Sequence, residues 1–187
     1  MRKVTHAASL LLFLLSLLLV ATNGNAATDI SDQKSSAPMD NDRLKTLISR
    51  IDKDFKGRPG YWQFSVEERT VTVITDDSAN RMRIISGVTK VDKLEPALMM
   101  RLLQANFDSA LDARYAVANG VLWSAYIHPL SSLQDKQFLE AVGQVVNLTS
   151  TFGSSYSSGA LIFNGGDSKE IQRRDLIDKL IEKGMAI

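Results

Sequence analysis

Apolar residues recur along the chain with two different periods, and each period predicts one kind of element. A spacing of three and four residues predicts a helix from about Asp40 to Phe55, a second over residues 94–106, a third beginning at Ser131 and a fourth from about Ser168. Alternation of apolar and polar residues predicts strands at 61–66, 70–75, 81–88, 113–118 and 121–127. The order α-β-β-β-α-β-β-α, with a final C-terminal helix, predicts an α+β fold with a mainly antiparallel five-stranded sheet packed by helices.

Turn and cap residues support these boundaries. Asn119-Gly120 separates two apolar runs and predicts a tight hairpin, because a type I′ turn needs positive φ at both central residues. Asp92 is the predicted cap of the second helix, and Ser131 with Gln134 is the predicted cap of the third. The second helix is expected to bury an apolar stripe, whose members are Leu94, Leu98, Met99, Leu102 and Leu103.

The first residues have the layout of a secretory signal. Arg2 and Lys3 precede a leucine-rich run without charge, and Gly24-Asn25-Ala26 offers small residues for cleavage. We therefore expect a signal peptide at 1–26, a flexible leader at 27–39, the folded domain at 40–152, and a Ser/Gly-rich linker with the C-terminal helix at 153–187. The alternative is an uncleaved N-terminal anchor. With cleavage, we expect no stable membrane insertion and an exported protein, periplasmic or secreted from a bacterium.

Composition excludes several classes of function. The chain has 22 basic and 21 acidic residues, and cleavage after Ala26 would remove two bases and no acid. A nearly neutral domain of this kind lacks the basic excess of a nucleic-acid binder. The chain has no cysteine, which excludes disulfides, thiolate metal sites, cysteine nucleophiles and a lipid-modified N-terminal cysteine.

No pattern of residues predicts a catalytic, cofactor or metal site. His128 is the one histidine beyond the predicted signal, and it precedes Pro129 with no acid or nucleophile nearby in sequence. The segment 76–80 (Asp-Asp-Ser-Ala-Asn) has closely spaced oxygen ligands, but it lacks the glycine and the distal glutamate of a calcium loop. We expect a turn there, and we expect Asp40 and Asp42 to mark the start of a helix.

Three arginines and one tryptophan are the candidate binding residues. Arg81 and Arg83 alternate with Met82 and Ile84, and Arg114 belongs to a strand of the same predicted sheet. On one exposed face they would receive an acidic peptide or an anionic head group; otherwise they are solvated positions opposite the core. Trp123 points away from Leu122 and its neighbours if the Asn-Gly turn sets the register, so both faces of the hairpin carry apolar side chains.

The element order and several short motifs resemble the type III secretion chaperone-like fold, which the Tir chaperone and YbjN-like families share. The resemblance covers residues 40–152. It is carried by the first helix, the strands within 61–88, Leu98-x-x-x-Leu102-Leu103-x-x-Asn106, Ala113-Arg114-Tyr115-Ala116, Asn119-Gly120-Val121-Leu122-Trp123 and Ile127-His128-Pro129-Leu130. It implies a homodimer that binds extended segments of other proteins without a cofactor or catalysis. Secretion chaperones are usually cytosolic and acidic, whereas this chain has an export signal and is nearly neutral.

The sequence therefore predicts an exported, non-enzymatic, chaperone-like domain that binds a protein or peptide segment. Two alternatives stay open. One is a periplasmic enzyme whose site is assembled around His128 or a carboxylate pair in a deep polar pocket. The other is a structural envelope protein whose self-association is its role. The sequence leaves open whether the C-terminal helix packs on its own domain or on a neighbouring copy.

Overall fold

The computed structural model describes residues 37–159 and 168–186 of the chain. The predicted signal, most of the predicted leader and residues 160–167 of the predicted linker lie outside the described residues. The elements, in chain order, are α1 (Asn41–Ile51), β1 (Lys56–Arg58), β2 (Tyr61–Val66), β3 (Arg69–Asp76), β4 (Arg81–Lys90), a 3-10 helix (Val91–Lys93), α2 (Pro96–Asp108), β5 (Arg114–Ala118), β6 (Val121–His128), α3 (Asp135–Ser150) and α4 (Ser168–Met185).

The first helix begins at the predicted place and ends earlier than predicted. Asp40 caps it, because its Oδ1 accepts a hydrogen bond from the backbone N–H of Arg43 at 2.8 Å. Its apolar side is buried through Ile51. Asp52 then adopts extended backbone with φ −140° and ψ 117°, so Phe55 packs against the core from beyond the helix. Met39, the last residue of the predicted leader, is also buried, and its N–H donates to the carbonyl of Ser131.

The strands form one antiparallel sheet in the order β1-β2-β3-β4-β6-β5. The β2–β3 and β5–β6 turns have positive φ at both central residues, as type I′ hairpins require. These values are 45° and 61° at Glu67 and Glu68, and 52° and 71° at Asn119 and Gly120. The alternation in β2 is confirmed, since Trp62, Phe64 and Val66 are buried and the residues between them are exposed.

The sheet has six strands, and the expectation of five is wrong. The additional strand is β1, whose three residues are all exposed, so it has no alternation for a sequence pattern to detect. It pairs with β2 through its backbone, with Gly57 opposite Trp62. Gly57 has φ 134°, and a Cβ at this position would lie 2.2 Å from the carbonyl oxygen of Tyr61. The strand therefore depends on glycine rather than on an apolar pattern.

Two predicted helix caps are wrong. Asp92 lies in the 3-10 helix, and α2 begins after Glu95 with Pro96 in its first turn. The third helix begins one turn later than predicted, because the side chains of Gln134 and Gln137 each accept a hydrogen bond from the other's backbone N–H. Ser131 instead donates its N–H to Oδ1 of Asn80 at 2.8 Å, which ties the β3–β4 turn to the start of α3.

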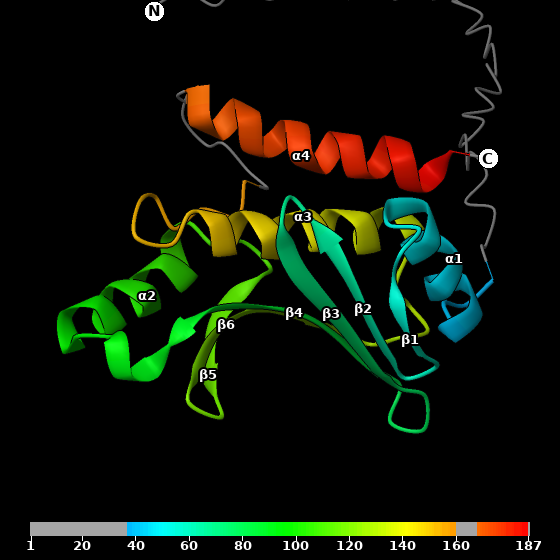
Figure 1. Cartoon of the computed structure of the whole chain (residues 1–187), viewed down its shortest axis with the longest axis horizontal. Helices are drawn as coiled ribbons and strands as arrows, with labels where there is room; N and C mark the ends of the chain where they lie inside the picture. Colours follow the sequence, from blue (N-terminus) through cyan, green and yellow to red (C-terminus); the bar gives the residue numbers. More distant parts are fainter. Residues whose placement is uncertain (1–36, 160–167, 187) are drawn as a thin grey trace, which may run out of the picture. The chain divides into compact units, whose positions relative to one another are not determined.

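The helices α1 and α3 cover one face of the sheet, and α4 packs on the outer side of α3 (Figure 1). Nearly every residue of α3 from Phe138 to Thr149 is buried. Glycines allow close approach of the last two helices. A Cβ on Gly143 would lie 2.6 Å from Cγ1 of Ile177, and one on Gly184 would lie 2.4 Å from Cδ2 of Leu139. The domain core therefore includes α4. Among the described helices, none combines the length and apolar content needed to span a bilayer.

Candidate functional site

The strand register places all four candidate binding residues on the face of the sheet that points away from α1 and α3, which we call the open face. In the strand register, Arg81 of β4 lies opposite Asp76 of β3, and Arg83 lies between Ile74 and Ile127. Trp123 of β6 lies opposite Gly87 of β4 on one side and Ala116 of β5 on the other, and Arg114 lies opposite Ala125. Other open-face residues include Lys56, Arg58, Tyr61, Gln63, Thr72 and Ile85. Apart from Thr72, the buried side chains of the same strands, including Met82 and Ile84, point to the opposite face.

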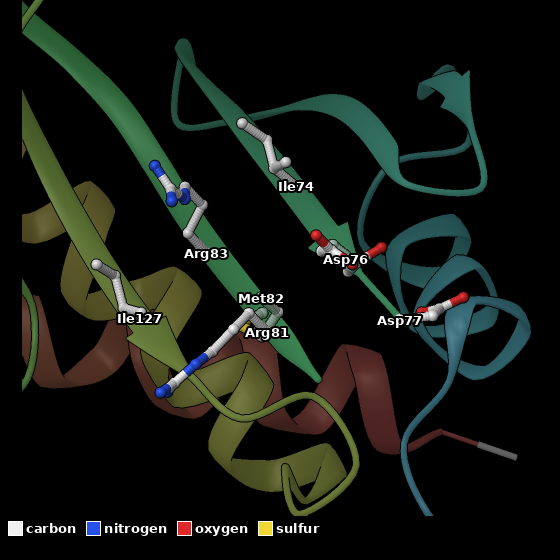
Figure 2. Close-up of a pocket in the computed structure, with 8 residues that line it drawn as sticks. Ile74, Asp76, Asp77, Arg81, Met82, Arg83 and Ile127 are labelled. Atoms are coloured by element: carbon white, nitrogen blue, oxygen red, sulfur yellow. The ribbon is translucent and has the colours of Figure 1, made fainter. Parts of the chain in front are cut away.

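An open hollow of about 680 Å³ lies on this face where β3, β4 and β6 run side by side. Figure 2 shows Ile74, Arg83 and Ile127 on these three strands, with Arg81 reaching across from β4 and the two aspartates near the end of β3. Ile127 is 62% exposed and Tyr61 is 42% exposed. The hollow therefore combines apolar side chains with guanidinium groups and has no covering layer among the described residues.

The acids and the bases of the hollow differ in their partners. Asp76 Oδ1 accepts hydrogen bonds from the Ser78 hydroxyl and the Ala79 N–H, which hold the pKa of this carboxyl below its usual range. Asp77 accepts a hydrogen bond from Nδ2 of Asn41 at 2.7 Å. In the described part of the chain, no acid forms an ion pair with Arg81 or Arg83. The two guanidinium groups are therefore available to an external anion.

Trp123 lies against the open face with its ring over Gly87. A Cβ on Gly87 would lie 3.6 Å from Cζ3 of Trp123, an ordinary van der Waals distance, so the ring packs against the backbone of β4. The indole Nε1–H donates to the carbonyl of Ala118 at 3.1 Å. The β4–β6 register shifts between Gly87 and Thr89, next to this contact. The ring is therefore held in place and half-buried, and its outer surface remains accessible.

Arg114 is exposed on the open face but its guanidinium is already bound. Its Nη1 donates to the carbonyls of Ala110 and Ala113, in the segment that leads into β5. The structure thus brings Arg81 and Arg83 together at the hollow and does not bring the Arg114 guanidinium to them.

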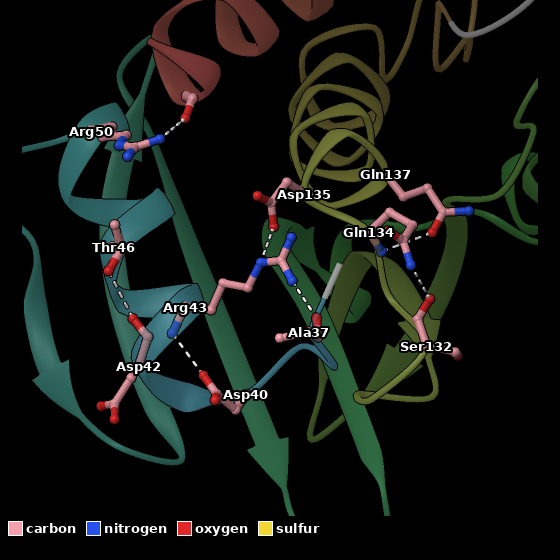
Figure 3. Close-up of polar contacts among 11 residues, drawn as sticks. Ala37, Asp40, Asp42, Arg43, Thr46, Arg50, Ser132, Gln134, Asp135 and Gln137 are labelled. Atoms are coloured by element: carbon pink, nitrogen blue, oxygen red, sulfur yellow. Dashed lines mark hydrogen bonds and ion pairs between the residues drawn. The ribbon is translucent and has the colours of Figure 1, made fainter. Parts of the chain in front are cut away.

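Several other arginines are likewise engaged within the domain. Figure 3 shows Arg43, whose Nε lies 2.6 Å from Oδ1 of Asp135 and whose Nη1 donates to the carbonyl of Ala37. It also shows Arg50, which donates to the carbonyl of Gly184 at 2.8 Å. Arg101 lies over the ring of Tyr156, 4.9 Å from its centroid. Unlike these arginines, Arg81 and Arg83 keep their positive charge available on the open face.

A second apolar surface lies on α2 and was missed by sequence reasoning. We define the α2 patch as Met100, Leu103, Phe107 and the edge-strand residue Val117. These side chains are 58%, 64%, 95% and 49% exposed. Leu103 and Val117 also line a hollow of about 240 Å³ between α2 and the β5–β6 hairpin. The expectation that Leu103 is part of a buried stripe is wrong, because only a narrow side of α2, with Leu102 and Ala105, faces the core.

The β5 edge beside this patch is partly closed by a side chain. The side-chain amide of Asn106 in α2 forms two hydrogen bonds with the backbone of Tyr115, as a neighbouring strand would. Its Oδ1 accepts the Tyr115 N–H at 2.7 Å, and its Nδ2 donates to the Tyr115 carbonyl at 3.1 Å. A sheet edge normally offers such groups to another strand. Here one amide satisfies both groups of Tyr115, so this part of the edge is closed to another strand.

The other candidate residues have local structural contacts. A ring nitrogen of His128, Nδ1, lies 2.8 Å from the carbonyl oxygen of Pro129, and its ring stacks on Tyr126 with centroids 6.0 Å apart. His128 is not among the residues that line the hollow. Residues 77–80 form the turn expected between β3 and β4. Within the described ranges, no three histidine, aspartate or glutamate side chains gather as metal ligands would.

Sequence reasoning found the two arginines and Trp123 but missed Tyr61, Ile74 and Ile127. Their signal was present, since each occupies the alternate position to a residue predicted to be buried. The apolar excess around α2 was a signal too, because a helix that is apolar on most sides is normally covered. In both cases the sequence does not show which surface is left without a packed layer of other elements.

No family model matches the chain, and no curated protein matches its sequence. Solved structures are similar to it. A chain of the HopA1–SchA chaperone–effector complex is 12% identical, with a TM-score of 0.45, and the match covers 60% of this chain and 94% of that chain. A chain of the ExsC–ExsE complex is 14% identical, with a TM-score of 0.45 and coverage of 59% and 92%. A chain of the Yersinia pestis type III secretion chaperone SycH in complex with a stable fragment of YscM2 is 10% identical, with a TM-score of 0.48 and coverage of 60% and 98%. Each of these matches covers most of the solved chain at low sequence identity.

Proposed function

We propose that this chain is an exported, non-enzymatic protein-binding domain of the chaperone-like kind, which holds a segment of a partner protein on its open face. The observation that carries the proposal is the difference between the two faces of one sheet. One face is buried under α1 and α3, whereas the other presents exposed Ile127 and Tyr61 beside two arginines without acidic partners.

Covering this face gives a free-energy gain that favours binding. Full burial of an exposed Ile or Phe side chain contributes about 1.5–3 kcal/mol, and Ile127 is still 62% exposed. Arg81 and Arg83 would add directional hydrogen bonds to carboxylates, and these are stronger than bonds between neutral groups. Apolar contact would thus supply most of the affinity, and the arginines would fix the orientation of the segment.

We also propose that the domain is a homodimer joined through the α2 patch. Met100, Leu103 and Phe107 repeat at spacings of three and four, so they form one row along the helix. No charged side chain interrupts this row. An uncharged apolar row is complementary to a second copy of itself, as a two-fold interface requires. A structural envelope protein would instead assemble beyond a dimer, so the size of the assembly separates the two ideas.

Export is supported by the charged start, leucine run and small residues of the first 26 positions. We expect the chain recovered from the envelope fraction of an expressing bacterium to begin at Ala27 by intact mass. A Leu14→Arg substitution in the apolar run should leave the chain uncleaved in the cytoplasm. Recovery of the full-length chain from the membrane fraction would instead support the uncleaved anchor.

Photo-crosslinking in the envelope tests the binding surface. A photoreactive residue at position 127 should give a defined crosslinked band, and the band should disappear when Arg81 and Arg83 are both changed to Glu. The same photoreactive residue in place of Lys45, which is exposed on α1, is the matched control and should not give that crosslinked band. Identical bands from positions 127 and 45, unaffected by the arginine changes, would show that the open face is not the binding surface.

A further inference from the structure

The backbone of the open face limits what can bind there. The strands β2, β3, β4 and β6 each have a neighbour on both sides, so their N–H and C=O groups are used in the sheet. A partner strand laid on this face would find no ladder to join, and its own backbone groups would lose water without a replacement. A helix satisfies its backbone groups internally and offers only side chains. The structure of the face therefore favours a helical occupant.

The apolar positions on the face have a suitable extent. Tyr61, Ile74, Arg83 and Ile127 form one row across four strands. With neighbouring strands about 4.8 Å apart, this row spans roughly 14 Å. A helix with its side chains is about 10–12 Å wide. Ile85 lies two residues along β4 from Arg83, and Trp123 lies one row beyond Ile85. The apolar area therefore extends in the direction of the strands, and a bound helix could lie with its axis in that direction.

The charge of the face specifies the chemistry of that helix. Its basic residues are Lys56, Arg58, Arg81, Arg83 and Arg114. Of the two acids at the hollow, Asp76 is held by its own turn and Asp77 accepts a hydrogen bond from Asn41. Arg83 lies between Ile74 and Ile127, and the other bases lie around them, so a helix seated there would bring its polar side chains to guanidinium and ammonium groups. Acidic margins would be attracted and basic margins repelled.

We propose that the open face binds an amphipathic helix of another protein, with an apolar stripe flanked by Asp and Glu residues. This inference rests on the proposed function and names the class of partner. Such a helix would form the missing outer layer of the sheet. Its apolar residues would recur at i, i+3 or i+4, and i+7, in the helix-in-groove manner of recognition.

The test uses two displayed peptide libraries of equal length, selected against the full chain. One has a helix-forming frame with variable faces, and the other is fully random. We expect enrichment of helical peptides with an apolar stripe and acidic margins. Synthetic copies should gain helicity on binding, seen by circular dichroism, and should bind more weakly as salt rises. Arg83→Glu and Ile127→Glu should each raise Kd at least tenfold, whereas Lys45→Glu, an equal charge change for the arginine variant on α1, should leave Kd within twofold.

The outcomes separate this inference from the proposed function. Peptides that depend on Ile127 and Arg83 but bind in an extended form, or carry basic margins, would overturn the acidic helix and leave a protein-binding face. Peptides that never depend on these residues would overturn both.

Sedimentation with vesicles of phosphatidylcholine and phosphatidylglycerol is a further arm of the test. Vesicle binding that Arg83→Glu and Ile127→Glu abolish, without any peptide that depends on them, would make a lipid surface the occupant and overturn the helix. Far-UV spectra and melting temperatures of the variants confirm that they fold.

Discussion

Polar residues at strand and helix ends hold the domain together at the scale of single side chains. Asp52 follows α1, and its carboxylate accepts the backbone N–H of Ser65 in β2 and that of Asp54, both at 2.9 Å. These two hydrogen bonds lower the pKa of Asp52 from 3.8, and the Ser65 bond is the larger cause. One half-buried residue thus connects the end of the first helix to the sheet.

This connection predicts a pH dependence of stability. Because the folded pKa of Asp52 is below the unfolded value, its contribution is fully present above pH 3.8 and is lost as pH falls toward the folded pKa. Asp52→Ala should lower the free energy of unfolding by about 1 kcal/mol at pH 6, measured by urea denaturation. The difference from the unchanged chain should shrink at pH 3.

Asp54→Ala is the matched control for Asp52→Ala. Its side chain is exposed, and its N–H remains free to bond Asp52. It should change stability by less than 0.5 kcal/mol at either pH. A difference between Asp52→Ala and the unchanged chain that is the same at pH 6 and pH 3 would contradict the role given to this carboxylate.

At the scale of elements, the close approach of α3 and α4 depends on glycine. In an isolated helix, Gly to Ala is favourable by about 1 kcal/mol. At Gly143 the added Cβ would lie 2.6 Å from Cγ1 of Ile177 and 3.3 Å from its Cα, so the clash involves backbone and the helices must separate. The crowding should outweigh the gain in helix propensity.

Gly143→Ala should therefore lower the free energy of unfolding by about 1–3 kcal/mol, measured by chemical denaturation. Ile177→Ala removes the atom that clashes, so the double variant should lose at least 1 kcal/mol less than the two single variants added together. Additive losses would show that α4 does not pack on Gly143.

Elements with their own local pattern could be predicted from the sequence. The strand 61–66 and the Asn119-Gly120 hairpin were predicted correctly, because alternation and turn chemistry lie within a few residues. The strand β1 was not, because it depends on the backbone pairing of Gly57 with β2 rather than on side chains. The cap at Gln134 was missed for a similar reason, since Ser131 is engaged by Asn80, which is 51 residues away in sequence.

The candidate site was predictable only in part, because its membership depends on register between strands. Arg81 and Arg83 were found from their alternation within β4. Their apolar neighbours Ile74 and Ile127 come from β3 and β6, and only pairing across strands brings them beside Arg83. The α2 patch was missed because apolar content does not say which side of a helix the domain covers.

At the scale of the whole molecule, the α2 patch predicts the oligomeric state. A dimer through this patch would bury Phe107, which is 95% exposed in the single chain. Leu103→Glu would place a charge in the centre of the interface without a partner. We expect the chain to have the mass of a dimer by size-exclusion chromatography with light scattering, and we expect the variant to have the mass of a monomer.

Lys45→Glu introduces the same side chain on α1 and should leave the dimer intact. A monomeric unchanged chain, or a dimer that Leu103→Glu does not affect, would contradict the proposed interface. Assemblies that grow beyond a dimer with concentration would support the structural alternative. The same variant should retain binding at the open face, since the two surfaces lie on different parts of the fold.

The contacts between α1 and α4 impose an order of events on biogenesis. Arg50 donates to the carbonyl of Gly184, and Lys183 donates to that of Ile51, across separations of 134 and 132 residues. The first helix therefore cannot reach its final packing until Gly184 has left the ribosome. Contacts this distant in sequence slow folding. The first helix must therefore stay without these contacts while more than 130 further residues of the chain are made.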